Sequence, residues 1–310
     1  MKKGDETENA AKLGKVGLTA GPYSVGQKVL ILDDERRGKK LAVLLDFPLA
    51  KVHSPVIIIS HGAGGEGANM HLLTEFWASH GYACFAPTHD DIERMGDPSN
   101  PKDVYSPEGA EGRANDLALV IDSLAALQSG LGALQCGFDV NRIGIAGHSY
   151  GAYIAMLFSG AVPLVDGTRQ VLADARPIAF LVLSGAGTGI LGLTENSWAD
   201  CRRPMMVMTG SLDSRGDGQG PEWRKQSFLS SPQGDKFLVY IEGARHNSFT
   251  GRATVDREYL EAEARIFAGV KLASLMFWDS YLKGDQAAIG FLAHKGLESA
   301  SGGIAGLSRR

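Results

Sequence analysis

The sequence has few cysteines, no large excess of charge and no long apolar run. Its 310 residues include only three cysteines, Cys84, Cys136 and Cys201, and their wide spacing contains no C-x-x-C pair. Three distant cysteines cannot form a disulfide scaffold and leave room for at most one bridge. The missing C-x-x-C pair also removes the usual cysteine signature of a metal or redox site.

Positive and negative charges are nearly balanced. The formal net charge is −4 and the sequence pI is ≈ 6.1, so we expect neither a nucleic-acid partner nor an anionic membrane partner. No apolar run is long enough to span a bilayer. The first 20 residues lack the apolar core of a signal peptide. We therefore expect a cytoplasmic protein, or a secreted one whose leader has been removed; the sequence indicates no oligomeric state.

The composition, 44% hydrophobic and 21% charged, is typical of one globular domain. Residues 1–22 are polar and contain glycine, which predicts a flexible N-terminal lead-in. Residues 296–310 are rich in glycine and serine, which predicts a flexible C-terminal tail. The folded domain is therefore expected over residues 23–295.

Apolar runs and amphipathic stretches alternate along this domain. Strand-like runs at 28–32 and 41–45 flank a charged turn, which predicts an antiparallel hairpin. The β-branched run at 56–60 predicts a central buried strand. Apolar residues at helical spacing predict long helices near 111–128 and 266–281. Together these patterns predict an α/β fold, whose mostly parallel central sheet is covered by helices on both faces and carries its site on the loops after the strands.

The pentapeptide GHSYG at 147–151 separates a strand-like run from an alanine-rich, helix-like run. This order predicts a strand, a tight turn and a helix, with Ser149 on the turn at the C-terminal edge of the sheet. A side chain at Gly147 or Gly151 would collide with the neighbouring strand and helix. Ser149 is therefore the candidate nucleophile, although a five-residue pattern also occurs by chance.

A serine nucleophile needs a base to remove its proton and an acid to orient that base. Asp213 follows the strand predicted at 205–208, and His246 follows the strand predicted at 237–241. The chain order Ser, Asp, His is that of α/β-hydrolases, in which the three residues lie at one edge of the sheet. We therefore predict a catalytic triad of Ser149, His246 and Asp213. The nearest rival acids are Asp200 and Asp217.

Acyl transfer also needs amide donors for the oxyanion of its tetrahedral intermediate. The N–H group of Tyr150 directly follows the nucleophile, and the glycine-rich loop HGAGG at 61–65 follows the central strand. These positions predict an oxyanion hole formed by the Ala63 and Tyr150 amides.

The same loop supports a second interpretation. Residues 62–67, from Gly62 to Gly67, fit G-x-G-x-x-G, and Asp90 follows at a distance suited to a dinucleotide site. A dinucleotide-binding oxidoreductase is therefore one alternative. Against it, a Rossmann unit normally opens its domain, and this function leaves the predicted triad unexplained. A non-catalytic binding protein that keeps the hydrolase fold is the other alternative.

Histidine and tryptophan give weaker signals. The histidines form no H-E-x-x-H motif or other tight ligand pair, so neither a metal site nor a cofactor is expected. His148 is expected to pack beneath the nucleophile. Trp198 follows the strand predicted at 178–183, at the functional edge, and is the predicted substrate-binding aromatic residue. Other aromatic candidates are Trp77, Trp223 and Tyr105.

Five short segments carry a resemblance to a known group of enzymes. They are SHGAG at 60–64, ASHGY at 78–82, GHSYG at 147–151, GARH at 243–246 and FWDSYLKG at 277–284. In this order, over about residues 25–292, they resemble α/β-hydrolases of the group that includes platelet-activating-factor acetylhydrolase-like, dienelactone-hydrolase-like and bacterial polyester hydrolases. The resemblance implies an α/β-hydrolase fold and a serine esterase that acts through an acyl-enzyme intermediate.

Two positions depart from relatives in this group. The plasma acetylhydrolase branch has its acid just past the strand that follows the helix after the nucleophile elbow, the tight turn that carries the nucleophile. This chain has LSGAG at 183–187 there, with no acidic residue, so the acid is Asp213. Dienelactone hydrolases carry a cysteine at the elbow, where this chain has Ser149. The short spacing between Ser149 and Asp213 leaves no room for a large lid domain, so we expect an open site for a small-molecule or polymeric ester.

Overall fold

A computed structural model of the chain describes residues 19–91, 104–130, 136–252, 260–294 and 296–310. Most of the predicted N-terminal lead-in, up to residue 18, lies outside these residues. The last part of it contacts the end of helix α2 (His71–Ser79), where the Gly21 amide donates to Ser79 Oγ at 2.9 Å.

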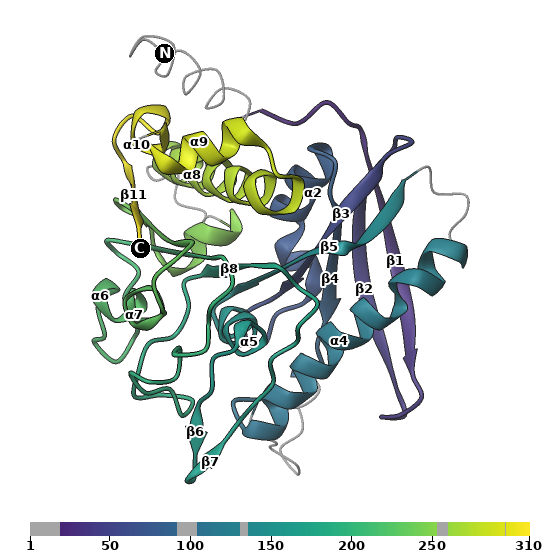
Figure 1. Cartoon of the computed structure of the whole chain (residues 1–310), viewed down its shortest axis with the longest axis horizontal. Coiled ribbons are helices and arrows are strands. Elements are labelled where there is room, and N and C mark those ends of the chain that lie inside the picture. Colours follow the sequence, from purple (N-terminus) through teal and green to yellow (C-terminus); the bar gives the residue numbers. More distant parts are fainter. Residues whose placement is uncertain (1–18, 92–103, 131–135, 253–259, 295) are drawn as a thin grey trace.

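Nine strands form the central sheet (Figure 1). In spatial order they are β1 (Val25–Asp34), β2 (Lys39–Pro48), β4 (Ala83–Thr88), β3 (His53–Ser60), β5 (Gly137–His148), β8 (Ala179–Leu183), β9 (Met205–Gly210), β10 (Lys236–Ile241) and β11 (Ala305–Arg309). The strands from β4 to β10 are mutually parallel, whereas β1 and β2 form an antiparallel hairpin. The predicted mostly parallel sheet with an antiparallel N-terminal hairpin is therefore confirmed.

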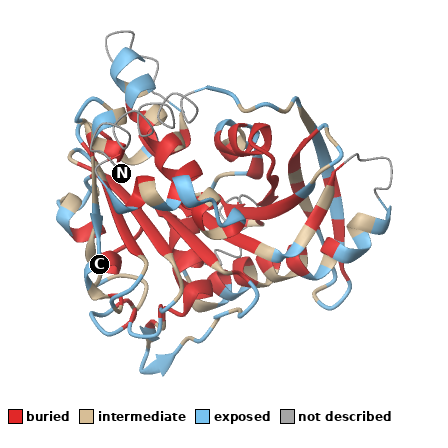
Figure 2. Cartoon of the chain, turned by 45° about the horizontal axis from the view of Figure 1, so that its top comes forward, coloured by how far each residue is buried: buried red, intermediate tan, exposed pale blue. Residues whose placement is uncertain are grey.

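Helices cover both faces of the sheet, as predicted (Figure 1). Helices α4 (Pro107–Gly130) and α5 (Tyr150–Ser159) cover one face, and α2, α8 (Leu260–Trp278) and α9 (Gln286–Ala293) cover the other. Because side chains alternate along a strand, Val56 and Ile58 of β3 enter the first core and Ile57 and Ile59 enter the second. The central strands are therefore buried on both sides, as Figure 2 shows.

The two long helices extend slightly beyond the spans expected from the sequence. Helix α4 packs the buried residues Leu117, Val120 and Leu124 on the sheet, which is the face that its helical spacing predicts. Helix α8 continues into a π-helical turn, η4 (Asp279–Lys283), which ends at Gly284 with a φ of 68°. Glycine suits this end because the left-handed region carries no Cβ penalty for it.

The C-terminal residues do not form the flexible tail that the sequence predicts. They form helix α10 (Gly296–Ala300) and strand β11, which pairs antiparallel with β10. Leu297 and Ala305 are fully buried in the core beneath α8 and α9. Without β11, strand β10 would present unpaired amide and carbonyl groups at the sheet edge, so the pairing satisfies backbone groups that composition does not reveal.

The connections near the site are short elements. Residues 149–213 are all described and contain α5, a small hairpin of β6 (Leu164–Val165) and β7 (Thr168–Arg169), β8 and β9, with no inserted domain. Residues 184–204, between β8 and β9, form turns rather than the helix that strict alternation would supply, and four glycines in this stretch disfavour a helix. Cys84, Cys136 and Cys201 are buried and unbridged. Among the described helices, none is long and apolar enough to cross a membrane.

Candidate active site

Ser149 lies where β5 ends and α5 begins, with φ 56° and ψ −116°. A non-glycine residue rarely adopts this conformation, and its strain is typical of functional turns. A Cβ at Gly147 would lie 2.0 Å from the Gly151 carbonyl oxygen, and a Cβ at Gly151 would lie 2.0 Å from the Ser60 carbonyl oxygen. The two glycines therefore allow the tight reversal that holds the serine at the edge of the sheet.

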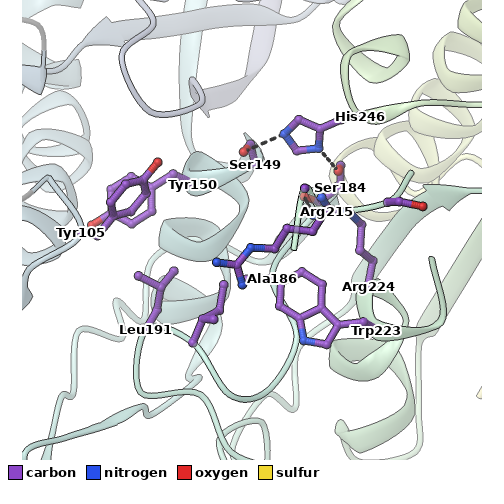
Figure 3. A pocket seen from close by; sticks show the side chains of 13 residues that line it. Tyr105, Ser149, Tyr150, Ser184, Ala186, Leu191, Arg215, Trp223, Arg224 and His246 are labelled. Atoms are coloured by element: carbon purple, nitrogen blue, oxygen red, sulfur yellow. Dashed lines mark hydrogen bonds between the residues drawn. The ribbon is translucent and has the colours of Figure 1, made fainter. Parts of the chain in front are cut away.

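His246 begins the short 3-10 helix η2 (His246–Thr250), just after β10. Its Nε2 lies 2.9 Å from Ser149 Oγ (Figure 3). This nitrogen can accept the serine proton if the other ring nitrogen, Nδ1, carries the hydrogen. The imidazole is about one-third exposed, at 35%, so it faces both the serine and solvent.

Asp213 follows β9 and is completely buried. Its Oδ1 lies 3.3 Å from His246 Nδ1, and its Oδ2 accepts a hydrogen bond from Thr209 Oγ1 at 2.9 Å. The structure thus brings Ser149, His246 and Asp213 together from the ends of three parallel strands. The rival acids lie elsewhere: Asp217 is exposed and pairs with Arg215, and Asp200 is exposed.

Ser184 stands between the histidine and the acid, a position that our sequence reasoning missed. Its Oγ lies 2.6 Å from His246 Nδ1 and donates to Asp213 Oδ1 at 2.9 Å. Because this hydroxyl donates to the carboxylate, it accepts from the Nδ1–H group. The imidazole is therefore linked to the carboxylate through Ser184 as well as directly. Figure 3 shows the contact between His246 and Ser184.

Arg224 is a second missed residue, from the short helix α6 (Pro221–Arg224). Its Nε lies 2.8 Å from Asp213 Oδ1, and its guanidinium donates to the carbonyl oxygens of Asp213 and Ser184 at 3.0 and 2.9 Å. Burial lowers the pKa of Arg224, and the neighbouring Asp213 charge opposes that shift. The acid is therefore held by a buried ion pair, which a sequence pattern does not indicate.

The two predicted oxyanion donors belong to segments that adjoin the serine. Ala63 belongs to the loop after β3, and this loop lines a hollow together with Ser149 and His246. Tyr150 is the first residue of α5, so its N–H group lies at the helix N-terminus, where amides point out of the helix. Gly62 packs closely here, because a Cβ on it would lie 3.4 Å from Ser149 Cβ.

Two hollows meet at the serine. The larger is about 520 Å³ and has apolar walls from Leu191, Ile190 and Trp223, with Arg215 directed into it (Figure 3). The second is about 430 Å³ and is lined by the loop at 62–65. Tyr105, Ser149 and His246 line both hollows.

The structure does not place Trp198 at either hollow. Trp198 is fully buried against α5, with its Nε1 3.2 Å from Met156 Sδ, because the turns after β8 fold back over that helix. The sequence showed that Trp198 follows a strand but not the direction of its loop. The indole at the pocket is Trp223, whose Nε1 donates to the Thr188 carbonyl at 2.8 Å.

The glycines of the G-x-G-x-x-G match have packing roles. A Cβ at Gly67 would lie 2.1 Å from the Ala86 carbonyl oxygen, and one at Gly65 would lie 2.8 Å from Asn69 Oδ1. The loop therefore needs these glycines for contacts within the protein. Among the described residues, no group of three or more histidine, cysteine or acidic side chains could hold a metal ion.

His148 packs beneath the elbow, as the sequence predicts, and braces the histidine loop. Its Nε2 donates to the His246 carbonyl oxygen at 2.8 Å, and the two rings lie 4.8 Å apart. Burial, followed by the charge of His246, lowers the pKa of His148 to about 4. At neutral pH this side chain is therefore uncharged.

The buried His148 predicts that the protein loses stability in mild acid. The unfolded chain binds a proton here near pH 6.5, whereas the folded chain resists protonation down to about pH 4. As the pH falls through this window the unfolded state gains protons first, so the free energy of unfolding should drop by about 2 kcal/mol between pH 7.5 and pH 5 from this residue alone. Urea unfolding at both pH values measures the change. His148→Gln, whose amide can still donate to the His246 carbonyl, should show a shallower dependence; an equally steep one would contradict the assignment.

Comparisons with known proteins agree with this architecture. A model described as "Dienelactone hydrolase family" matches residues 41–182. The comparison with curated proteins gave no match. The match runs from β2 to β8 and includes the loop at 62–65 and Ser149, but it ends before Asp213 and His246. It confirms the predicted resemblance to dienelactone-hydrolase-like proteins and, with the sheet topology, the predicted α/β-hydrolase fold.

Proposed function

We propose that this α/β-hydrolase is a serine esterase, which cleaves carboxylic esters through an acyl-enzyme intermediate on Ser149. One observation carries the proposal: an unbroken series of contacts joins Ser149 Oγ to His246 and then to Ser184 and the buried Asp213. A hydroxyl is a weak nucleophile at neutral pH, and this arrangement supplies both the base and the group that orients it.

In the proposed reaction, Ser149 Oγ attacks the ester carbonyl while His246 Nε2 accepts the serine proton. The imidazolium then gives that proton to the departing alcohol oxygen, which leaves an acyl group on Ser149. Water attacks this acyl group with His246 again as the base, and the proton returns to Ser149 Oγ as the acid departs. The Asp213 charge, acting directly and through Ser184, stabilises the imidazolium in both steps.

The Ala63 and Tyr150 amides are proposed to stabilise the tetrahedral intermediates. Negative charge gathers on the former carbonyl oxygen in each step, and fixed N–H donors stabilise it more than the neutral ester. The two hollows that meet at Ser149 suit the two parts of an ester, one for the acyl group and one for the alcohol. Because no domain is inserted between Ser149 and Asp213, we propose a small ester or an accessible polymer chain as substrate.

Covalent labelling tests this function directly. A fluorophosphonate probe should add to Ser149 in the folded protein, because the activated hydroxyl attacks phosphorus as it attacks a carbonyl. Intact mass spectrometry and peptide mapping measure the adduct, and p-nitrophenyl esters of increasing acyl length measure turnover. Ser184, which also contacts His246, serves as an internal control and should stay unmodified. A folded protein that neither labels nor turns over any ester would instead support the non-catalytic binding protein.

A further inference from the structure

A buried arginine lies directly behind the loop that carries Ala63. Arg113 of α4 is 1% exposed, and its guanidinium donates to the His61 carbonyl at 2.6 Å and to the Gly62 carbonyl at 3.2 Å. It also pairs with Asp91, and Asp91 Oδ2 accepts a hydrogen bond from the Gly64 amide at 3.0 Å. A single ion pair therefore contacts the loop on both sides of Ala63.

The Gly62 carbonyl shows how this contact reaches the site. Its oxygen accepts three hydrogen bonds, from the Arg113 guanidinium, from His61 Nδ1 at 2.7 Å and from the Gly65 amide at 3.2 Å. A trans peptide is planar, so the C=O of Gly62 and the N–H of Ala63 point in opposite directions. Donors that fix the carbonyl from behind therefore fix the direction of the Ala63 N–H.

Arg113 also contacts the residue that supplies the other proposed donor. Its Cζ lies 4.7 Å from the centroid of the Tyr150 ring, a cation–π distance. Tyr150 and Ala63 come from segments far apart in the sequence. The Arg113 guanidinium contacts both segments, through the Tyr150 ring and through the Gly62 carbonyl that precedes Ala63. No other arginine or lysine among the described residues has hydrogen bonds to this loop.

Two buried histidines complete the support. The His89 amide donates to His61 Nε2 at 3.1 Å, so the proton of a neutral His61 sits on Nδ1, which faces the Gly62 carbonyl. His89 Nδ1 in turn lies 2.8 Å from Asp116, and its Nε2 lies 2.9 Å from Ser60 Oγ. Burial lowers the pKa of both imidazoles, so at neutral pH the cation behind the loop is Arg113.

We propose that Arg113, with Asp91 as its counter-charge, is a positioning residue that fixes the direction of the Ala63 amide in the oxyanion hole and holds the ring of Tyr150, the other proposed donor residue. The inference rests on the proposed esterase function. Arg113 touches no reacting atom. It acts by holding the Gly62–Ala63 peptide and the Tyr150 side chain in place before the substrate arrives. Such preorganisation contributes to the rate only where charge develops, in the tetrahedral intermediate and the transition states around it.

Arg113→Lys tests the proposal, with Arg203→Lys as a matched control. Lysine keeps the positive charge but cannot hold two carbonyls and a carboxylate together, because its ammonium is a single point. Arg203 makes equivalent contacts away from the site: it donates to the carbonyls of Asp174, Pro177 and Phe158 at 2.6, 2.6 and 2.8 Å. Its Cζ also lies 4.6 Å from the Phe180 ring. Both substitutions therefore remove the same kind of clamp.

The two readouts are ester kinetics and inhibition by an alkyl trifluoromethyl ketone, which Ser149 converts into a tetrahedral adduct with an oxyanion. Arg113→Lys should lower kcat by about 10- to 100-fold, with KM within about threefold, and weaken inhibition by a similar factor. Arg203→Lys should leave kcat and inhibition within about twofold, even if both variants lose comparable stability in urea. An Arg113→Lys enzyme with normal kcat and normal inhibition would overturn the proposal, and so would equal losses in Arg203→Lys.

A second variant guards against a misfolded Arg113→Lys protein. Asp91→Asn keeps an oxygen for the Gly64 amide but removes the charge that holds the guanidinium, so it should reduce kcat and inhibition together by about three- to tenfold. Unchanged values in this folded variant would contradict the proposal. The two levels of failure are separable: wild-type protein without Ser149-dependent hydrolysis would overturn the esterase function and this inference with it, whereas an active wild type with unaffected variants would overturn this inference alone.

Discussion

Replacement of Ser149 by alanine is expected to lower the turnover of a short-chain p-nitrophenyl ester by about 10⁴-fold or more, because it removes the atom that we propose forms the acyl-enzyme. The proposed oxyanion amides and the proposed substrate pocket remain, so substrate binding should change little. Initial rates at saturating substrate measure the loss, and active-site titration with a fluorophosphonate shows whether any reactive serine remains. Retention of wild-type turnover would exclude Ser149 as the nucleophile.

Stability measurements separate this loss from damage to the fold. Ser149 has a φ of 56°, a region that glycine adopts without strain and alanine does not. Ser149→Gly should therefore be as inactive as Ser149→Ala but more stable than it by about 1 kcal/mol in urea unfolding. If the two inactive variants ranked in the opposite order, the strained turn would not be the conformation in solution.

Ser159→Ala is the matched control for this experiment. Ser159 is a buried serine at the other end of α5 from Ser149, and its Oγ donates to the Met156 carbonyl at 2.7 Å. Its loss should reduce stability by about 1 kcal/mol and leave turnover within about twofold. Equal inactivation of both serine variants would point to a general effect on the helix.

The arrangement of the candidate triad could be foreseen because it follows from the sheet. Parallel strands end at one edge, so residues just past β5, β9 and β10 meet there. A strand-like run followed by a serine between glycines is visible in the sequence, and so are Asp213 and His246 directly after apolar runs. These predictions needed only the period of the strands and the order of the residues.

The groups that support the site depend on loop paths and on buried polar contacts, which sequence patterns show poorly. Ser184 has a φ of 52°, and this backbone turn places its hydroxyl between the His246 imidazole and the Asp213 carboxylate. The strand register alone does not predict such a turn. The sequence predicts Trp198 at the functional edge, but its loop folds back along α5 and its side chain is buried against Met156. Arg113 did leave a signal: it lies four residues before Leu117 on the apolar stripe of α4, where a charge needs a buried partner.

The C-terminal segment illustrates the same limit for the fold. Glycine and serine at 299–303 suggested a flexible tail, yet the following residues complete the sheet beside β10. Composition describes the local preference of the chain, whereas the pairing is decided by the unsatisfied edge that β10 offers. The long strands and helices were predictable because each carries its own periodic pattern of apolar residues. Strand β11 has only five residues and shows no such pattern.

Asp213→Asn is the second substitution expected to have a large effect. An amide in place of the carboxylate cannot stabilise the imidazolium and favours the wrong histidine tautomer, so turnover should fall by about 10³- to 10⁴-fold with KM nearly unchanged. The substitution also leaves the buried Arg224 without its counter-charge, which should lower the free energy of unfolding by about 3 kcal/mol. Kinetics and urea unfolding of the same preparation measure the two effects. Normal turnover in the folded variant would show that Asp213 is not the acid that supports His246.

A carboxylate at position 184 should recover part of this activity in the Asp213→Asn background. Ser184 Oγ lies 2.6 Å from His246 Nδ1, so an aspartate there can accept the same hydrogen bond, and aspartate tolerates a positive φ better than most residues. It would also return a negative charge beside Arg224, which already donates to the Ser184 carbonyl at 2.9 Å. We expect Asp213→Asn with Ser184→Asp to turn over ester at least about tenfold faster than Asp213→Asn alone. Ser184→Asn in the same background has the same shape without the charge and should give no gain; equal gains from both would mean that the side chain at 184 acts by packing and not as an acid.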